Sequence, residues 1–239
     1  MLITKHFRCI FLISEIFVRS CFVAYQIDTT IPELLVSSLP IDLVTSIEEG
    51  LPVGARRAYA AARGMDEGHL PTVVGQLRHF HMNETFHRAL AVNQANPSPL
   101  CGNKVVVGRA GIFSLARFNI HEGYWRNYRR SLTRKQLSEA NRSIEPLVQP
   151  ELFSGYTPAT EAVAFFVAVF AGSLRVSPEA PTSIQIAVPD SQMKSWLFRE
   201  PISSFLERYN RVQDVQRDLA VPRLKKIADQ QQRNDGTGK

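Results

Sequence analysis

The chain has 239 residues, of which 44% are hydrophobic and 21% charged, and its net charge is +6. This composition is typical of a globular protein and excludes a largely disordered chain. No apolar run approaches the ~20 residues that a membrane-spanning helix needs, so no transmembrane span is predicted. The three cysteines, Cys9, Cys21 and Cys101, are odd in number and lack metal-ligand spacing, which predicts a reducing, cytoplasmic location.

Residues 1–27 are predicted to form an apolar helical segment, and residues 28–40 a linker. A helical projection of the segment places its polar side chains on one narrow arc: Lys5, Arg8, Glu15, Arg19 and Gln26. The rest of that helix is apolar, so it must be buried or lie on a surface. Residues 1–25 are therefore a candidate contact for a protein partner or a membrane surface.

Residues 41–222 are predicted to form a single globular domain that begins with helices. Asp42 is a candidate N-cap for a brief helix that ends near Gly50. A second helix is predicted over residues 53–63, because a proline suits its first turn and a glycine its end. Apolar residues at helical spacing then predict a longer helix over residues 71–93.

Residues 104–120 are predicted to form a β-hairpin, because a β-branched run is followed by glycines and a second apolar stretch. The turn is placed at Gly108–Gly111. A helix over residues 112–120 is the alternative, since a short apolar run does not distinguish strand from helix. A strand followed by glycines is also typical of phosphate loops, but the G-x-x-x-x-G-K-[ST] pattern is absent, which favours a turn.

Two further helices are predicted after the hairpin. Thr133 and Gln136 form a capping-box pattern that predicts a helix over residues 134–145. The longest apolar run, residues 162–171, is predicted to be a buried helix because it is rich in alanine and ends at a glycine. A core strand is the alternative for this run.

The last elements are a strand and two helices. Alternation of apolar and polar residues predicts a strand over residues 183–188, and Asp190 is a candidate cap for a short helix through Trp196. An amphipathic helix over residues 202–220, a second candidate contact for a protein partner, precedes a basic, partly disordered tail over residues 223–239. The predicted fold class is α+β, mostly helical, with a small antiparallel sheet.

Positive charge is concentrated in one central segment. Eight basic and two acidic residues lie between Arg109 and Arg142, an excess equal to the net charge of the whole chain. Arginines pair with phosphates and aromatic rings stack on bases. The sequence therefore predicts a non-enzymatic protein that binds nucleic acid or another polyanion with low specificity through Trp125, Arg126, Tyr128, Arg129, Arg130, Arg134 and Lys135. The alternative is a solvated basic surface whose aromatic residues lie in the core.

Histidines form a second group of candidate residues, so an enzyme with a histidine-containing site is an alternative function. Its candidate residues are His79, His81, Glu84, His87 and His121. Glu84 and His87 form an E-x-x-H pair, but the second such pair that di-iron helical bundles need is absent. Neither a metal nor another cofactor is therefore predicted. A third alternative is a protein-interaction module that uses the apolar helices.

Overall fold

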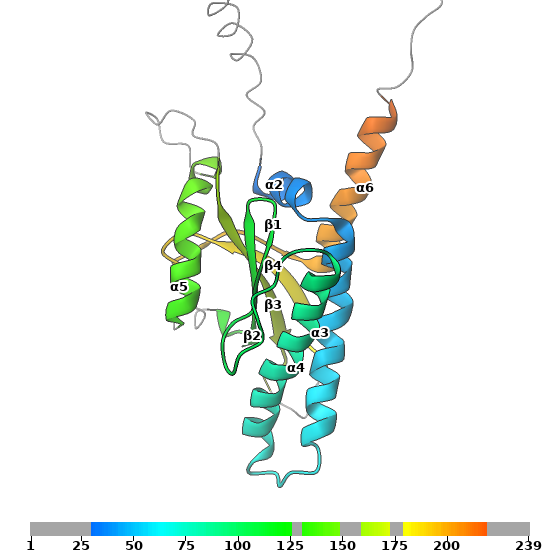
Figure 1. Ribbon diagram of the computed structural model, residues 1–239, viewed down its shortest axis with the longest axis vertical. Helices are drawn as coiled ribbons and strands as arrows, with labels where there is room; N and C mark the ends of the chain where they lie inside the picture. Colours follow the sequence, from blue (N-terminus) through cyan, green and yellow to red (C-terminus); the bar gives the residue numbers. More distant parts are fainter. Residues whose placement is uncertain (1–29, 126–130, 149–158, 173–178, 219–239) are drawn as a thin grey trace, which may run out of the picture.

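The fold is known from a computed structural model that describes residues 30–125, 131–148, 159–172 and 179–218. It has three layers (Figure 1): a five-stranded sheet lies between a hairpin of two long helices on one face and a short helix on the other. The predicted segment 1–27 and the predicted tail 223–239 lie outside the described residues. None of the described helices is both long enough and apolar enough to cross a membrane.

The sheet has the strand order β1-β2-β3-β4-β5. Its strands are β1 (Val107–Ala110), β2 (Phe113–His121), β3 (Ala162–Phe170), β4 (Ser183–Pro189) and β5 (Trp196–Pro201). Neighbouring strands are antiparallel except β2 and β3, which are parallel. The α+β class is confirmed, but the predicted small antiparallel sheet is wrong: the sheet is mixed and larger, because it gains strands at residues 162–170 and 196–201.

Strand β3 is the element whose type the sequence predicted incorrectly. The predicted helix over residues 162–171 is wrong, and all nine residues of β3 are buried. Phe166 belongs to the apolar cluster beneath the helical hairpin, whereas Phe165 belongs to the cluster on the opposite side of the sheet. A strand covered on both faces is apolar at every position, so it lacks the alternation that identifies a half-exposed strand.

The hairpin consists of α3 (Ile41–Ala62) and α4 (Leu70–Val92). The prediction of α4 is confirmed, but the predicted break between two helices at residues 50–53 is wrong, because α3 continues through Pro52. Four fully buried apolar residues recur every fourth position along α3, at Leu43, Ile47, Leu51 and Ala55. This continuous apolar stripe packs in the core and compensates for the hydrogen bond that a proline removes from a helix.

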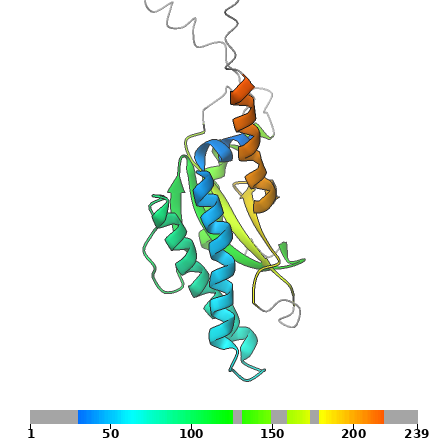
Figure 2. The same cartoon turned by 90° about the vertical axis from the view of Figure 1, so that its right-hand side faces the viewer.

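A shorter helix, α2 (Ile31–Ser38), occupies most of the segment predicted as a linker. The backbone N–H of Thr30 donates to the Glu33 carboxylate at 2.8 Å, so the first turn is capped. Ile31 and Leu35 are buried in the core. The segment is therefore attached to the domain, and Figure 2 shows α2 above the start of α3 and beside α6.

The predicted hairpin over residues 104–120 is confirmed as the antiparallel pair β1–β2, and the helical alternative is wrong. Its turn lies at Gly111–Ile112 rather than at Gly108–Gly111. Gly108 is within β1, where a Cβ atom would lie 2.5 Å from Leu90 Cδ2 of α4. The first glycine is thus needed for close packing and the second, at φ +54°, for the turn.

The connection from β2 to β3 contains α5 (Leu132–Ser138), followed by 3₁₀ turns over residues 139–143 and 145–147. The predicted helix over residues 134–145 is wrong in extent and in its cap: the Ser131 hydroxyl accepts the Arg134 backbone N–H at 3.4 Å. Asn141 is fully buried, donates to the Pro189 carbonyl at 2.7 Å and accepts from the Val163 N–H at 2.6 Å. It therefore attaches the connection to β3 and β4.

The remaining predictions have mixed outcomes. The strand over residues 183–188 is confirmed as β4, and the last helix is confirmed as α6 (Ile202–Asp218). The short helix after Asp190 is wrong. The Asp190 carboxylate accepts three backbone N–H groups and the Ser195 hydroxyl, closing a turn that leads directly into β5. These hydrogen bonds hold the pKa of Asp190 below its usual value, although burial opposes them.

We expect Gly54→Val to lower the free energy of unfolding by about 1–3 kcal/mol, because a Cβ at residue 54 would lie 2.8 Å from the His81 carbonyl oxygen and 2.9 Å from Met82 Cα. Gly75→Ala is the matched control on the same hairpin. It has open space around it and should raise stability by about 0.5–1 kcal/mol through helix propensity. Denaturation in guanidinium chloride measures both. Equal effects would mean that α3 and α4 are not in close contact.

Candidate functional site

Three residues of the predicted nucleic-acid-binding set can be placed in the structure: Trp125, Arg134 and Lys135. The other four, Arg126, Tyr128, Arg129 and Arg130, lie outside the described residues. Trp125 precedes residues 126–130 and Arg134 follows them. Both contact the face of the sheet that α5 covers. We refer to Trp125, Arg134, Lys135 and Arg199, together on this side of the sheet, as the basic face.

Trp125 is half-buried and packs against the sheet. Its ring makes an edge contact with Trp196, with 5.6 Å between ring centroids. The guanidinium carbon of Arg199, on β5, lies 4.5 Å from the Trp125 ring centroid. Sequence reasoning missed Arg199 because it is 74 positions away in the chain. The contacts indicate that Trp125 anchors this surface and holds an arginine on it.

Arg134 and Lys135 differ in exposure. The guanidinium carbon of Arg134 lies 4.4 Å from the centroid of the Phe118 ring, and burial lowers the pKa of Arg134. Lys135 is exposed. Arg134 therefore attaches the start of α5 to β2, whereas the Lys135 ammonium is available to a ligand.

The charge excess between Arg109 and Arg142 is not confined to one surface. Arg109 is exposed on β1, opposite Ser114 near the start of β2, and Arg117 is buried beneath the helical hairpin. The concentration of charge along the sequence therefore overstates the concentration of charge on the basic face.

The candidate residues of the predicted histidine site lie at separate places in the structure. His81 Nδ1 lies 3.3 Å from the Glu84 carboxylate, which also pairs with Arg57 at 3.2 Å on the outer side of the hairpin. His87 is half-buried further along α4, and His121 is exposed at the end of β2. Within the described ranges, no three histidine, cysteine or acidic residues are placed to hold a metal ion.

A buried arginine network that the sequence did not predict lies between α4 and β2. Arg117 is 4% exposed, and three of its nitrogens donate hydrogen bonds. Nε donates to Asn83 Oδ1 at 2.9 Å, Nη1 to Asn119 Oδ1 at 2.8 Å, and Nη2 to the His79 carbonyl at 2.9 Å. Asn83 also donates to the Lys104 carbonyl at 3.3 Å and lies 3.2 Å from His79 Nε2. The network thus links α4, β2 and the segment before β1.

A second buried arginine lies nearby on α4. Arg78 is 5% exposed, and its guanidinium carbon lies 3.9 Å from the centroid of the Phe170 ring. Phe170 is the register partner of His121 at the carboxyl end of the parallel pair β2–β3. We define the arginine cluster as the six polar residues gathered at this end of the hairpin–sheet interface: Arg78, His79, Asn83, Arg117, Asn119 and His121.

Burial dominates the electrostatics of the arginine cluster. Desolvation lowers the pKa of Arg117 to about 9 and that of Arg78 to about 10. Both remain charged at neutral pH. Burial, with the nearby charge of Arg117, also lowers the pKa of His79, so its imidazole is neutral at pH 7.

One feature of the sequence could have indicated the arginine cluster. Alternate residues of β2 share a face, and the apolar Phe113 and Leu115 are followed on that face by Arg117, Asn119 and His121. Such a change from apolar to polar on a buried face indicates a site, but only once β2 is known to be covered by α4.

Comparisons with protein-family models, with curated proteins and with solved structures find no significant match to this chain.

We expect Arg117→Met and Asn83→Leu each to destabilise the fold by about 1.5–3 kcal/mol, because each leaves a buried hydrogen-bonding partner unsatisfied. The double variant should be more stable than the sum of the two effects predicts, by about 1–3 kcal/mol, since it removes both sides of one interaction. Urea denaturation of the four proteins measures this coupling. Strict additivity would contradict the hydrogen bond between Arg117 and Asn83.

Proposed function

We propose that this protein is a non-enzymatic polyanion-binding protein, with nucleic acid as its ligand, and that it binds through the basic face and the adjoining residues 126–130. The observation that supports this most directly is the anchoring of both flanks of that segment. Trp125 contacts Trp196 and Arg199, and Arg134 contacts Phe118, all on one side of the sheet. The described residues that flank the three arginines in the sequence therefore both contact this side of the sheet.

Nucleic acid suits this surface because charge and aromatic rings occur together on it. Lysine and arginine neutralise phosphates without regard to base sequence, which gives low specificity and strong salt dependence. Tyr124, next to Trp125, is 59% exposed and is the better candidate for stacking on a base. The separate locations of the candidate residues of the histidine site give less support to the alternative of a histidine-based enzyme.

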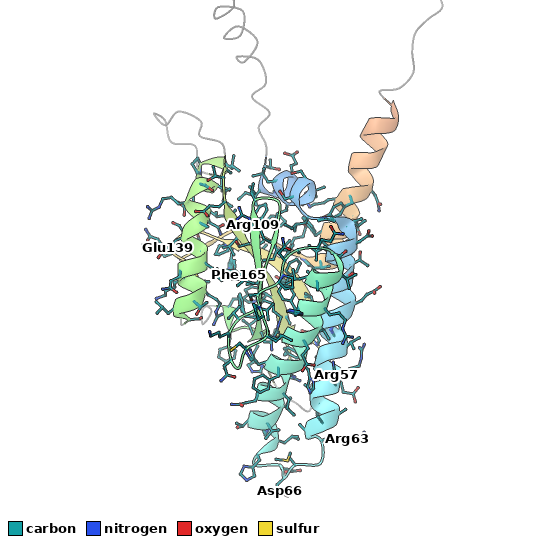
Figure 3. All side chains as sticks on the ribbon, viewed as in Figure 1. Arg57, Arg63, Asp66, Arg109, Glu139 and Phe165 are labelled. Carbon is teal, nitrogen blue, oxygen red and sulfur yellow. The ribbon has the colours of Figure 1, made fainter. Side chains whose placement is uncertain are left out.

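We expect binding to single- and double-stranded DNA that weakens steeply with salt. If four cations each meet a phosphate, the slope of log K against log salt on duplex should be about −3.6. Lys135→Ala and Arg199→Ala should each make that slope less steep by about one unit. Arg63→Ala is the matched control, because Arg63 is an exposed arginine at the tip of the hairpin, far from α5 (Figure 3). Fluorescence anisotropy over a salt series measures all four proteins.

Two outcomes would contradict the proposal. The first is the absence of binding by the folded protein at about 50 mM salt, where electrostatic binding is strong. The second is a reduction of the slope in Arg63→Ala equal to that in Lys135→Ala, which would indicate attraction by net charge alone.

Aromatic variants separate stacking from packing. Tyr124→Ala should weaken binding to a single strand by about 1–3 kcal/mol and leave thermal stability unchanged. Trp125→Ala should lower the melting temperature, because its ring contacts Trp196 and Arg199 within the fold. Binding and melting are measured on the same preparations.

A further inference from the structure

The arginine cluster lies on the opposite side of the sheet from the basic face and has features of a separate binding site. We propose that it binds a small oxyanion, the phosphate or carboxylate group of a ligand, at the carboxyl end of β2–β3. This inference does not rest on the proposed function, because no residue is shared between the two surfaces.

Arg117 has more hydrogen-bond donors than the described residues accept from. A guanidinium group has five N–H bonds, and three of those on Arg117 donate to Asn83, Asn119 and the His79 carbonyl. One N–H on each terminal nitrogen remains without an acceptor among the described residues. Two such N–H groups on adjacent nitrogens match the two oxygens of a carboxylate or phosphate. The protein's own contacts thus hold the guanidinium in place and leave two of its N–H bonds for a ligand.

The charge of Arg117 also favours an anionic ligand. All three acceptors of Arg117 are neutral, and none of the described carboxylates bonds to it. Glu84, on α4, pairs instead with Arg57 and His81. Glu122, just after β2, is exposed. Arg117 is thus 4% exposed and makes no hydrogen bond to a described carboxylate. Burying a charge without an opposite charge costs several kcal/mol, and a bound anion offsets that cost.

Packing alone does not require an arginine at residue 117. The preceding residues on this face of β2, Phe113 and Leu115, are apolar and fully buried. Replacement of a whole buried ionic network, arginine and hydrogen-bonding partners together, by well-packed apolar residues is commonly neutral or stabilising. Arginine at residue 117 is therefore better explained by a ligand than by packing.

Polar residues lead from Arg117, in the middle of β2, through Asn119 to His121 at the carboxyl end of the parallel strands β2 and β3. The carboxyl ends of parallel strands are where open sheets bind ligands. The helical hairpin continues past this edge of the sheet in both views (Figures 1 and 2). His79 and Asn119 are half-buried and His121 is exposed, so the polarity extends from the interior to the surface. An anionic group reaches Arg117 from this edge, with His121 at the entrance.

The test is calorimetric titration of the full chain with inorganic phosphate in chloride buffer of constant ionic strength, with acetate as a second arm. We expect saturable binding with one site per chain, and the tighter ligand of the two identifies phosphate or carboxylate as the group recognised. Arg117→Lys keeps the charge but loses the paired donors, and Arg78→Gln removes the second charge. Each should weaken binding about tenfold or more.

Arg109→Gln is the matched control, because Arg109 is an exposed arginine on β1 opposite Ser114, near the start rather than the carboxyl end of β2, and belongs to neither the basic face nor the arginine cluster. It should bind phosphate as the wild type does. Asn119→Asp tests the site without loss of folding, since it places a carboxylate beside Arg117 Nη1. It should raise the melting temperature and weaken phosphate binding about tenfold or more. His121→Ala, at an exposed position, should fold normally and weaken binding by a smaller factor.

The inference is overturned if neither anion binds saturably to the wild type. It is also overturned if Arg109→Gln loses phosphate binding while Arg117→Lys and Asn119→Asp retain it, because the anion would then bind outside the arginine cluster. Neither result depends on DNA binding, so this inference and the proposed function can fail separately.

Discussion

The structure depends on the parallel pairing of β2 and β3. These strands pair along their full lengths, Phe113–His121 against Ala162–Phe170. Parallel neighbours need a crossover connection, and here it contains α5 and the two 3₁₀ turns. Because β3 is apolar on both sides, each face of the sheet must be covered. The helical hairpin covers one face, α5 lies on the other, and the two candidate surfaces follow from this division.

The hairpin–sheet interface changes character along its length. Phe86 packs against Phe166, with ring centroids 6.0 Å apart, in an apolar core. One turn before Phe86 on α4, Asn83 instead accepts a hydrogen bond from Arg117, which is the register partner of Phe166 on β2. A continuous apolar interface would suffice for stability. The polar part of the interface fixes the position of α4 along the sheet. A shift of α4 by one turn would separate Asn83 from Arg117, and both are buried away from water.

The two faces of the sheet therefore present arginines in different ways. On the basic face, Arg134 and Arg199 lie over aromatic rings near solvent, where exposed ion pairs are weak and screened by salt. In the arginine cluster, Arg117 is enclosed by α4 and the sheet, where the effective dielectric constant is low and each charge interacts strongly. The first arrangement suits a large, diffuse polyanion, and the second suits one small anionic group.

The sequence by itself determined the elements whose signals are local: α4, α6, the β1–β2 hairpin and β4. It did not determine β3, because a strand buried on both faces has no periodicity to distinguish it from a buried helix. Pro52 and Gly50 predicted a break in α3, but the fully buried stripe that includes Leu43 and Leu51 carries the helix through them. The histidines of α4 were identified as candidates, yet Arg117 was counted only as part of a basic segment. Only the tertiary structure placed it beneath α4, because burial and hydrogen-bond partners 34 and 38 positions away depend on how the helices cover the sheet.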